Sequence, residues 1–255
     1  MKSTNRFSNN PKKPDSAAFL NPSDALCEEI MPDSEEGDEF SDWSSWDPYE
    51  ISEDFDNPEN LKNMESYHID SCRAHTCFFT GHRALPEAQK SALLIRLRSV
   101  ISYLYAKGVT DFHAGGALGF DTLAAMQIID MKRDHPAMRL ILDLPFPGQS
   151  RQWTANHKRI YDFILSMADE YHYINEKDPV SHAEVRKCLL MRNCAMVHAG
   201  QYCIAYFSGA KGGTGYTLAK AEKYGCEIFN LFAEQAGSSA EQQLSLSESP
   251  IHVKK

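Results

Sequence analysis

Three kinds of segment are missing from this sequence of 255 residues, and each absence excludes a class of protein. No stretch approaches the ~18 consecutive uncharged apolar residues that a membrane-spanning helix requires. The first twenty residues lack the apolar core of a secretory signal, and their composition differs from the arginine-rich, acid-poor composition of a transit peptide. We therefore expect a cytoplasmic protein with no membrane partner.

Metal and disulfide chemistry also lack their usual signatures. The seven cysteines are scattered without a C-x-x-C pair, which argues against both a disulfide framework and a zinc site. The chain has ten histidines, and five of them lie in the folded part without ligand spacing and on different predicted elements: His113, His135, His157, His172 and His182. No metal site is expected, most cysteines are expected to be reduced core thiols, and the sequence identifies no cofactor.

Basic residues do not predominate, and the net charge of −9 is unevenly distributed. Residues 1–70 carry 18 Asp and Glu against 5 Lys and Arg, giving −13, whereas residues 71–255 carry 17 against 21, giving +4. An acidic segment with few aliphatic side chains cannot bury enough surface to offset the entropy that ordering would cost. We therefore predict a disordered acidic region over 1–70, one folded domain over 71–235 and a flexible tail over 236–255.

The acidic region also contains aromatic side chains, which allow a second interpretation of it. Phe40, Trp43, Trp46, Tyr49 and Phe55 lie among its carboxylates. Such a segment could fold on contact with a protein partner, whereas the simpler interpretation is a tail that only keeps the chain solvated.

The rest of the chain alternates short apolar runs with runs of helical periodicity. The predicted strands are 75–80, 109–115, 138–146, 170–176, 202–209 and 226–232, and the helices between them are 86–108, 120–134, 154–169, 181–200 and 214–225. Because β-α-β crossovers are right-handed, this strict alternation predicts a mostly parallel sheet with helices on both faces. The expected fold class is α/β, Rossmann-like and doubly wound. In such sheets, ligands bind beyond the carboxyl ends of the strands.

Three turns that follow predicted strands contain glycine. Their sequences are TGHR at 80–83, AGGALGFD at 114–121 and SGAKGGTGYT at 208–217. Glycine lets backbone N–H groups approach a ligand, and the helix N-terminus that follows adds partial positive charge and unpaired donors. These features predict a cradle for an anion such as phosphate, whereas tight turns that need glycine for packing alone are the alternative. Neither the G-x-G-x-x-G nor the G-x-x-x-x-G-K-[ST] pattern is present.

Polar side chains near these turns complete the predicted pocket. Arg83 could hold a phosphate with both arms of its guanidinium, and Asp121 could cap helix N–H groups or accept a ribose hydroxyl. Arg192 and Asn193 could point from their helix back to the cleft or lie on the surface. The candidate ligand-binding residues are Gly81, His82, Arg83, Gly115, Gly116, Ala117, Asp121, Arg192, Asn193, Gly212, Gly213, Thr214, Gly215 and Tyr216. No catalytic residue is assigned.

Taken in order, these motifs carry a resemblance to a known group of proteins. CFFTGHR, AGGALGFDTLAA, MRNCAMV and SGAKGGTGYTLAKAEKYG resemble the successive motifs of the SLOG superfamily, which contains the DprA/Smf DNA-processing proteins and the LOG nucleotide hydrolases. The resemblance is to the YpsA/YoqJ-like branch and covers residues 74–233. It implies a Rossmann-like nucleotide-binding domain, with the ligand phosphates against Gly115, Gly116 and Gly212 to Gly215 and with Arg83 and Arg192 nearby.

The sequence departs from both the LOG and the DprA patterns at positions that bear on activity. LOG enzymes have P-G-G-x-G-T-x-x-E, but here Lys211 replaces the Pro, Tyr216 replaces the Thr, and Leu218 and Ala219 stand at the acidic end. Without that carboxylate, N-glycosidase activity is not implied. DprA-like proteins usually carry Arg where this chain has Leu118, and a charge of +4 on residues 71–255 does not favour nucleic acid as the partner.

Three functions remain open at this point. The preferred one is a sensor or regulatory module that binds a nucleotide or nucleotide derivative. The second is a hydrolase or transferase acting on a nucleotide derivative, with Asp121, His82 or Glu184 as acid or base. The third is single-stranded DNA binding of the DprA kind. The basic residues that it would use are Arg83, Arg151, Arg192 and Lys211.

Two further expectations apply to all three functions. Trp153, Tyr216 and Phe146 lie near the predicted loops and could stack on a base, with core packing as the alternative. Members of the superfamily often dimerise, so the resemblance also implies a homodimer as a possible assembly.

Overall fold

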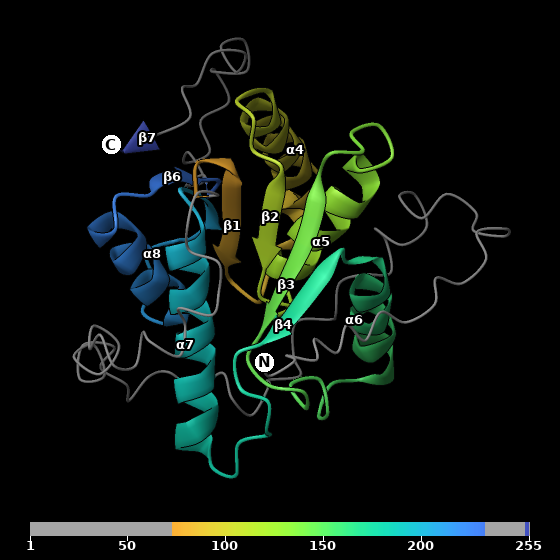
Figure 1. The fold of residues 1–255 in the computed structure, drawn as a ribbon, viewed down its shortest axis with the longest axis vertical. Coiled ribbons are helices and arrows are strands. Elements are labelled where there is room, and N and C mark those ends of the chain that lie inside the picture. Colours follow the sequence, from red (N-terminus) through yellow and green to blue (C-terminus); the bar gives the residue numbers. More distant parts are fainter. Residues whose placement is uncertain (1–72, 233–252, 255) are drawn as a thin grey trace, which may run out of the picture. The chain divides into compact units, whose positions relative to one another are not determined.

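The structure is a computed structural model, and it describes residues 73–232 and 253–254 (Figure 1). The predictions for residues 1–70 lie outside the described residues. Most of the predicted flexible tail at 236–255 lies outside them too, although residues 253 and 254 form a short strand. Residues 73–232 fall within the range 71–235 predicted for the folded domain.

Six parallel strands form the sheet, in the order β4-β3-β2-β1-β5-β6, and β7 adds an antiparallel strand at the β6 edge. The strands are β1 (Thr76–Gly81), β2 (Asp111–Ala114), β3 (Arg139–Leu144), β4 (Glu170–Tyr173), β5 (Tyr202–Tyr206), β6 (Glu227–Asn230) and β7 (Val253–Lys254). In the centre, Phe78 of β1 is in register with His113 of β2 and with Cys203 of β5. The predicted mostly parallel sheet is confirmed.

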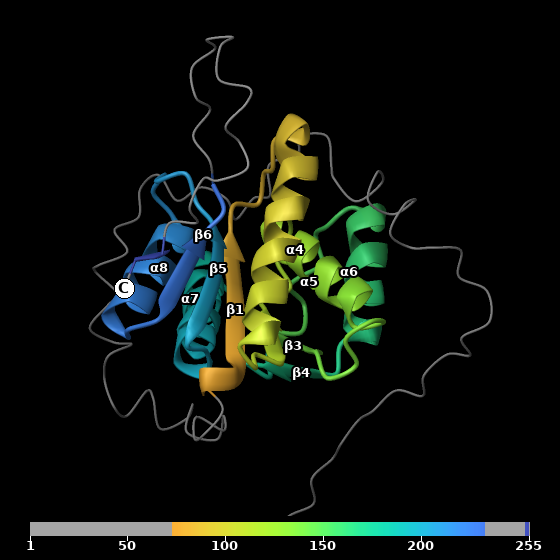
Figure 2. The ribbon, with the colours of Figure 1, turned by 90° about the horizontal axis from the view of Figure 1, so that it is seen from above.

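Helices cover the sheet on both faces (Figure 2). The helices are α4 (Lys90–Ala106), α5 (Phe120–Met131), α6 (Ala155–Met167), α7 (His182–Ala199) and α8 (Gly213–Lys223). Helices α4, α5 and α6 lie on one face, and α7 and α8 lie on the other (Figure 2). The chain moves outward from β1 to β4, and α7 then returns it to the other side of β1, where β5 lies. This is the predicted doubly wound, Rossmann-like fold.

The central strand β1 is buried on both faces, which explains the apolar run Cys77, Phe78 and Phe79 at its centre. Phe78 packs with Met196 of α7 on one face, and Phe79 contacts the rings of Phe112 and Phe120 on the other. Gly81 ends the strand, and a Cβ at this position would lie 2.6 Å from the Cβ of Phe120. The missing side chain therefore allows the start of α5 to approach the carboxyl end of β1.

The described residues contain no element long and apolar enough to be a membrane-spanning helix. The described cysteines are buried, and they make no disulfide bonds with one another: Cys77, Cys188, Cys194, Cys203 and Cys226. Within the same ranges, no three His, Cys, Asp or Glu side chains gather as metal ligands.

The sheet contains one buried ion pair, between neighbouring strands. His113 Nδ1 of β2 lies 2.7 Å from Asp143 Oδ2 of β3, and both side chains are buried. Burial alone would lower the pKa of His113, but Asp143 outweighs it, so the pKa is raised above its usual value. Asp111 raises this pKa further and Arg139 lowers it. The charged imidazolium is therefore the form that the folded sheet favours.

We predict that His113→Asn removes a stabilising contribution that depends on pH. A raised pKa in the folded state gives stability that is complete below the unfolded pKa of about 6.5 and is lost as pH rises through the folded value. Urea unfolding of both proteins should show a larger free-energy difference at pH 6 than at pH 9. His157→Asn is the control, and a difference for His113→Asn that stays constant with pH would contradict the interpretation.

Candidate functional site

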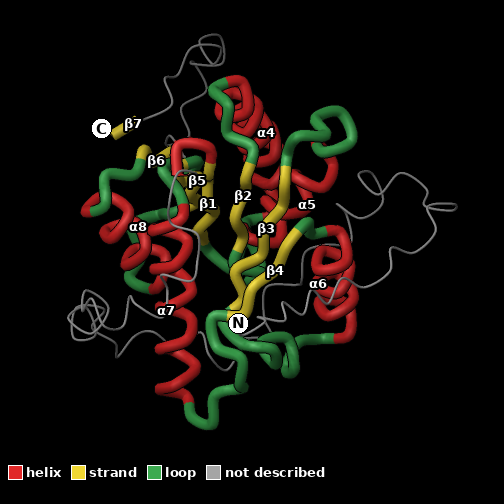
Figure 3. Tube along the Cα trace, viewed as in Figure 1, coloured by secondary structure: helices red, strands yellow, loops and turns green. Residues whose placement is uncertain are grey.

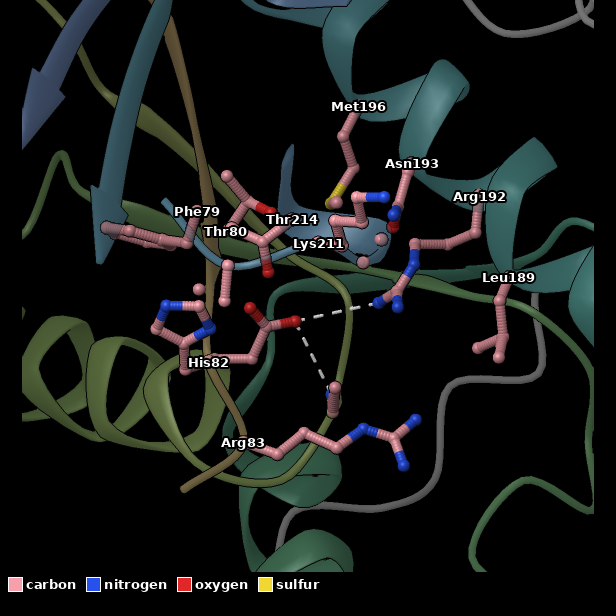
Figure 4. A pocket seen from close by; sticks show the side chains of 16 residues that line it. Phe79, Thr80, His82, Arg83, Leu189, Arg192, Asn193, Met196, Lys211 and Thr214 are labelled. Carbon is pink, nitrogen blue, oxygen red and sulfur yellow. Dashed lines mark hydrogen bonds and ion pairs between the residues drawn. The ribbon is translucent and has the colours of Figure 1, made fainter. Parts of the chain in front are cut away.

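The strand order reverses at β1, and the candidate site lies at that reversal. The connections from β1 and β5 leave toward opposite sides of the sheet, which opens a crevice beyond the carboxyl ends of these strands. The loops that follow the strands gather at one end of the sheet, where the parallel strands finish (Figure 3). A pocket of about 250 Å³ occupies the crevice, and its walls come from the loops after β1, β2 and β5 and from α7 (Figure 4).

The structure brings most of the predicted ligand-binding residues together at this pocket. Those that line it are Gly81, His82, Arg83, Ala117, Asp121, Arg192, Asn193, Gly212, Gly213 and Thr214. Leu189 and Met196 of α7 also line it, although the sequence analysis did not select them. Their spacing of three or four residues from Arg192 and Asn193 places all four on one helix face, so helical periodicity could have identified them.

Four predicted residues do not line the pocket: Gly115, Gly116, Gly215 and Tyr216. A Cβ on Gly115 would lie 1.3 Å from Nη1 of Arg192, so this glycine makes room for the guanidinium from behind. Tyr216 is buried with Leu190 and Cys194 between α7 and α8, with its hydroxyl 3.8 Å from the Cys194 sulfur. The structure therefore gives Tyr216 a packing role.

The two glycine-rich loops use glycine for different reasons. In the loop after β2, Gly116 and Gly119 have φ values of 63° and 81°, and a Cβ on Gly119 would lie 2.1 Å from the carbonyl oxygen of Arg83. In the loop after β5, Gly209 and Gly212 have φ values of 91° and 148°, but a Cβ on either would meet no atom within 4 Å. Close packing therefore requires glycine at positions 116 and 119, whereas Gly209 and Gly212 lie in open space beside the pocket.

Asp121, at the start of α5, is turned toward the loop after β2. Its Oδ2 accepts hydrogen bonds from the backbone N–H groups of Gly115 at 3.0 Å and Ala117 at 3.4 Å, and it lies 3.5 Å from Nη1 of Arg192. Capping of α5 was one expected role, but no side chain caps this helix. Burial raises the pKa of Asp121, while Arg192 and the two N–H groups oppose that rise.

Arg192 extends from α7 into the pocket, where Arg83 reaches from the opposite wall (Figure 4). Its side chain is buried, and within the described part of the chain its Nε and Nη1 have no hydrogen-bond acceptor. Burial lowers the pKa of Arg192, Asp121 opposes this, and the like charge of Arg83 lowers it further. Buried donors without acceptors are rare because each costs about 1–3 kcal/mol. Arg192 itself lines the pocket, so its guanidinium is positioned to meet an anion there.

His82 connects the loops after β1 and β5. Its Nε2 lies 2.9 Å from both the backbone nitrogen and the hydroxyl of Ser208. Because a backbone N–H only donates, Nε2 is the acceptor, and the ring is the neutral tautomer with its proton on Nδ1. Burial lowers the pKa of His82, in agreement with this assignment. His82 thus positions the two loops and adds no positive charge near neutral pH.

The first turn of α8 faces the pocket through Gly212, Gly213 and Thr214, and no side chain caps it. The amide of Asn193 donates to Thr217 Oγ1 at 2.8 Å, and that hydroxyl donates to the carbonyl of Gly213 at 2.7 Å. Asn193 therefore fixes this turn against α7. The N–H groups of a first turn have no partners within their helix, and they carry the positive end of its dipole.

Asp121 is the one acidic side chain among the described residues that line the pocket. Glu184, considered above as an acid or base, lies outside that lining at the start of α7. Its backbone N–H donates to Ser181 Oγ at 3.2 Å, and its carboxylate accepts from the N–H of Val180 at 2.9 Å. Ser181 thus caps α7, and the Glu184 carboxylate holds the chain just before the helix. The arrangement of the pocket suits the binding of an anion better than it suits acid–base chemistry.

Comparison with known sequences decides the family. The YpsA model, described as the YspA SLOG family, matches residues 73–230, more than half of the chain. The chain belongs to this SLOG family. The match confirms the resemblance inferred from the order of the four motifs.

Sequence relatives of this chain were found as well. An uncharacterized SPbeta prophage-derived protein, YoqJ of Bacillus subtilis, is 32% identical over 139 residues, which are 50% of this chain and 79% of YoqJ. A UPF0398 protein of Bacillus velezensis is 24% identical over 159 residues, covering 60% of this chain and 83% of the relative. Both sequence relatives are matched over most of their own length.

Two structures of DNA processing protein A were also found. The structure from Streptococcus pneumoniae has a TM-score of 0.47 and 16% sequence identity. The match covers 64% of this chain and 52% of the Streptococcus pneumoniae chain, so this chain spans about half the length of that protein. The structure from Helicobacter pylori, described for its single-stranded DNA binding mode, has a TM-score of 0.46 and 20% identity and covers 68% of this chain and 71% of that one.

We predict that Gly115→Ala and Arg192→Ala are coupled in their effects on stability. With Arg192 present, the new methyl group must displace its guanidinium from Asp121, and overpacking of this kind costs about 1–3 kcal/mol. With Arg192 already removed, the two shortest contacts of the methyl group are gone and Asp121 Oδ2, at 2.8 Å, remains, so urea unfolding should show a smaller cost of Gly115→Ala in that background.

The matched control is Gly209→Ala, whose added methyl group meets open space. Its cost arises from the left-handed backbone alone and should be the same with or without Arg192. Additive effects of Gly115→Ala and Arg192→Ala would show that the guanidinium does not occupy the space behind Gly115.

Proposed function

We propose that this protein binds a nucleotide or nucleotide derivative, with a phosphate of the ligand beside Arg192. The observation that carries this proposal is the buried Arg192 guanidinium, two of whose nitrogen atoms lack hydrogen-bond acceptors among the described residues. Arg83 and Lys211 add two more cations to the lining, while Asp121 is occupied by backbone N–H groups and Arg192. The pocket therefore offers more donors than its own acceptors use.

A phosphate suits this arrangement because the donors approach from different directions. The planar guanidinium of Arg192 can donate two parallel hydrogen bonds to oxygen atoms of one phosphate. The uncapped first turn of α8, at Gly213 and Thr214, adds backbone donors and the positive end of a helix dipole. At about 250 Å³, the pocket is slightly smaller than most ligand pockets and suits the phosphate-bearing part of a nucleotide.

We further propose that the protein acts as a sensor or regulatory module and not as a hydrolase. General acid–base catalysis needs a side chain that can exchange a proton with the ligand. Asp121 already accepts two hydrogen bonds and pairs with Arg192, and His82 uses Nε2 to accept from Ser208. These contacts favour a binding function over turnover.

Thermal unfolding of the full chain with a panel of ligands tests the proposal. The panel contains nucleoside mono-, di- and triphosphates, nucleotide sugars, dinucleotides, pyrophosphate and a short single-stranded oligodeoxynucleotide. A ligand at 100 times its Kd stabilises a protein by about 2.7 kcal/mol, which for a domain of this size raises the Tm by roughly 5–10 °C. We expect such a shift with one class of nucleotide, which chromatography should then recover unchanged.

Arg192→Lys provides the site-specific variant, because it keeps the positive charge beside Asp121 but loses the planar donor geometry. We expect it to weaken nucleotide binding by at least about tenfold, since two parallel hydrogen bonds to phosphate are replaced by a point charge. Arg133→Lys, at the far end of α5, is the control and should bind like the unchanged protein.

Three results would contradict the proposed function. Unchanged nucleotide binding by Arg192→Lys would remove Arg192 from the phosphate site. Stabilisation by the oligodeoxynucleotide alone, with a steep dependence on salt, would indicate DNA binding through phosphate contacts instead. Conversion of the bound nucleotide would indicate an enzyme.

A further inference from the structure

A second pocket adjoins the first and shares part of its wall. Its volume is about 180 Å³, and it lies between the loop that leads from β3 to α6 and the loop that leads from β4 to α7. Arg83, Ala117 and Leu189 line both pockets. A single ligand that is anchored beside Arg192 can therefore extend past Arg83 into the second pocket.

The lining of the second pocket differs chemically from that of the first. Trp153 and Phe146 supply aromatic surface, and Val185, Pro179 and Leu189 add apolar contacts. Polar groups lie among them: the side chains of Gln149, Gln152, Asp178 and Arg151. Apolar and aromatic walls with a few polar groups suit a flat heteroaromatic ring that has donors and acceptors along its edge.

Hydrogen bonds hold this pocket in place without a ligand. Gln149 donates from Nε2 to the carbonyl of Gly116 at 3.0 Å, which joins the pocket wall to the loop after β2. Asp178 accepts from the N–H of Gly148 at 2.6 Å, and a Cβ on Gly148 would lie 2.7 Å from this same carboxylate oxygen. The two loops that form the pocket are thus joined to each other and to the first site.

The indole of Trp153 is held by an aromatic neighbour. It meets Tyr161 of α6 edge to face, with the ring centroids 5.4 Å apart. Tyr161 is itself buried, so the indole rests on a fixed part of the core. A preformed aromatic wall binds a ring with little additional cost in ordering.

We propose that the second pocket binds the base of the nucleotide, with the indole of Trp153 stacked on it, while the phosphate lies beside Arg192. Arg83 lies between the two subsites and contacts the ligand where base and phosphate are joined through the sugar. This inference rests on the proposed function and specifies the ligand further: its affinity depends on the base as well as on the phosphate.

Tryptophan fluorescence and calorimetry test this proposal in the full chain. The chain has three tryptophans, Trp43, Trp46 and Trp153. Trp43→Phe combined with Trp46→Phe leaves Trp153 as the single indole. Purine and pyrimidine nucleoside monophosphates are then compared with ribose 5-phosphate, which has the sugar and the phosphate but no base.

We expect at least one nucleotide to quench Trp153 and to bind about tenfold or more tightly than ribose 5-phosphate, the size of effect that stacking on one aromatic side chain produces. Ribose 5-phosphate should bind, as measured by calorimetry, without quenching. Trp153→Leu keeps an apolar side chain but removes the stacking surface, so it should reduce nucleotide affinity to that of ribose 5-phosphate. Tyr171→Leu, an exposed aromatic position on β4, is the control and should change neither affinity.

The outcomes separate this inference from the proposed function. Equal affinities for nucleotide and ribose 5-phosphate, without quenching, would overturn the base pocket and leave the phosphate site intact. Absence of binding by every phosphate-bearing compound would overturn the proposed function and the inference together. Quenching is measured with Trp153 present, so this result does not depend on the folding of Trp153→Leu.

Discussion

The site depends on one interaction, the buried ion pair between Asp121 and Arg192. Asp121 belongs to α5 on one face of the sheet, and Arg192 belongs to α7 on the other, so the pair joins the two helical layers beyond the carboxyl ends of the strands. Gly81 lets α5 approach β1, and Gly115 leaves space for the guanidinium. The ion pair therefore requires glycine at position 115, and the position of α5 beside β1 requires glycine at position 81.

Burial of this ion pair costs desolvation free energy, and hydrogen bonds to the two partners offset that cost unequally. Asp121 receives two backbone N–H groups in addition to Arg192, whereas Arg192 keeps two nitrogen atoms without acceptors in the described structure. A buried ion pair adds stability only when further hydrogen bonds satisfy both partners. The carboxylate meets this condition, whereas the guanidinium has the ion pair with Asp121 but no hydrogen-bond acceptor for Nε or Nη1 among the described residues.

Local sequence patterns predicted the sheet and most of the pocket, but not the contacts between distant segments. Strict alternation of apolar and amphipathic runs is sufficient for a doubly wound sheet, and the turns after strands identified His82, Asp121 and Thr214 as pocket residues. No local signal shows that Gly115 packs against Arg192 or that Tyr216 is buried between two helices, because both facts depend on how α7 crosses the sheet. The loop around Trp153 lacks clustered glycines, so its pocket gave no signal of the same kind.

The loops on the two sides of the site differ in how closely they are packed around their glycines. In the loop after β2, Gly116 and Gly119 are in close contact with their surroundings, and Asp121 and Gln149 hold its backbone with hydrogen bonds. In the loop after β5, Gly209 faces open space, as does Gly212 at the end of this loop. His82 and Asn193 also hold the second loop and the turn that follows it, so an anion beside Arg192 would meet two hydrogen-bonded walls, of which only the wall after β2 is closely packed at these glycines.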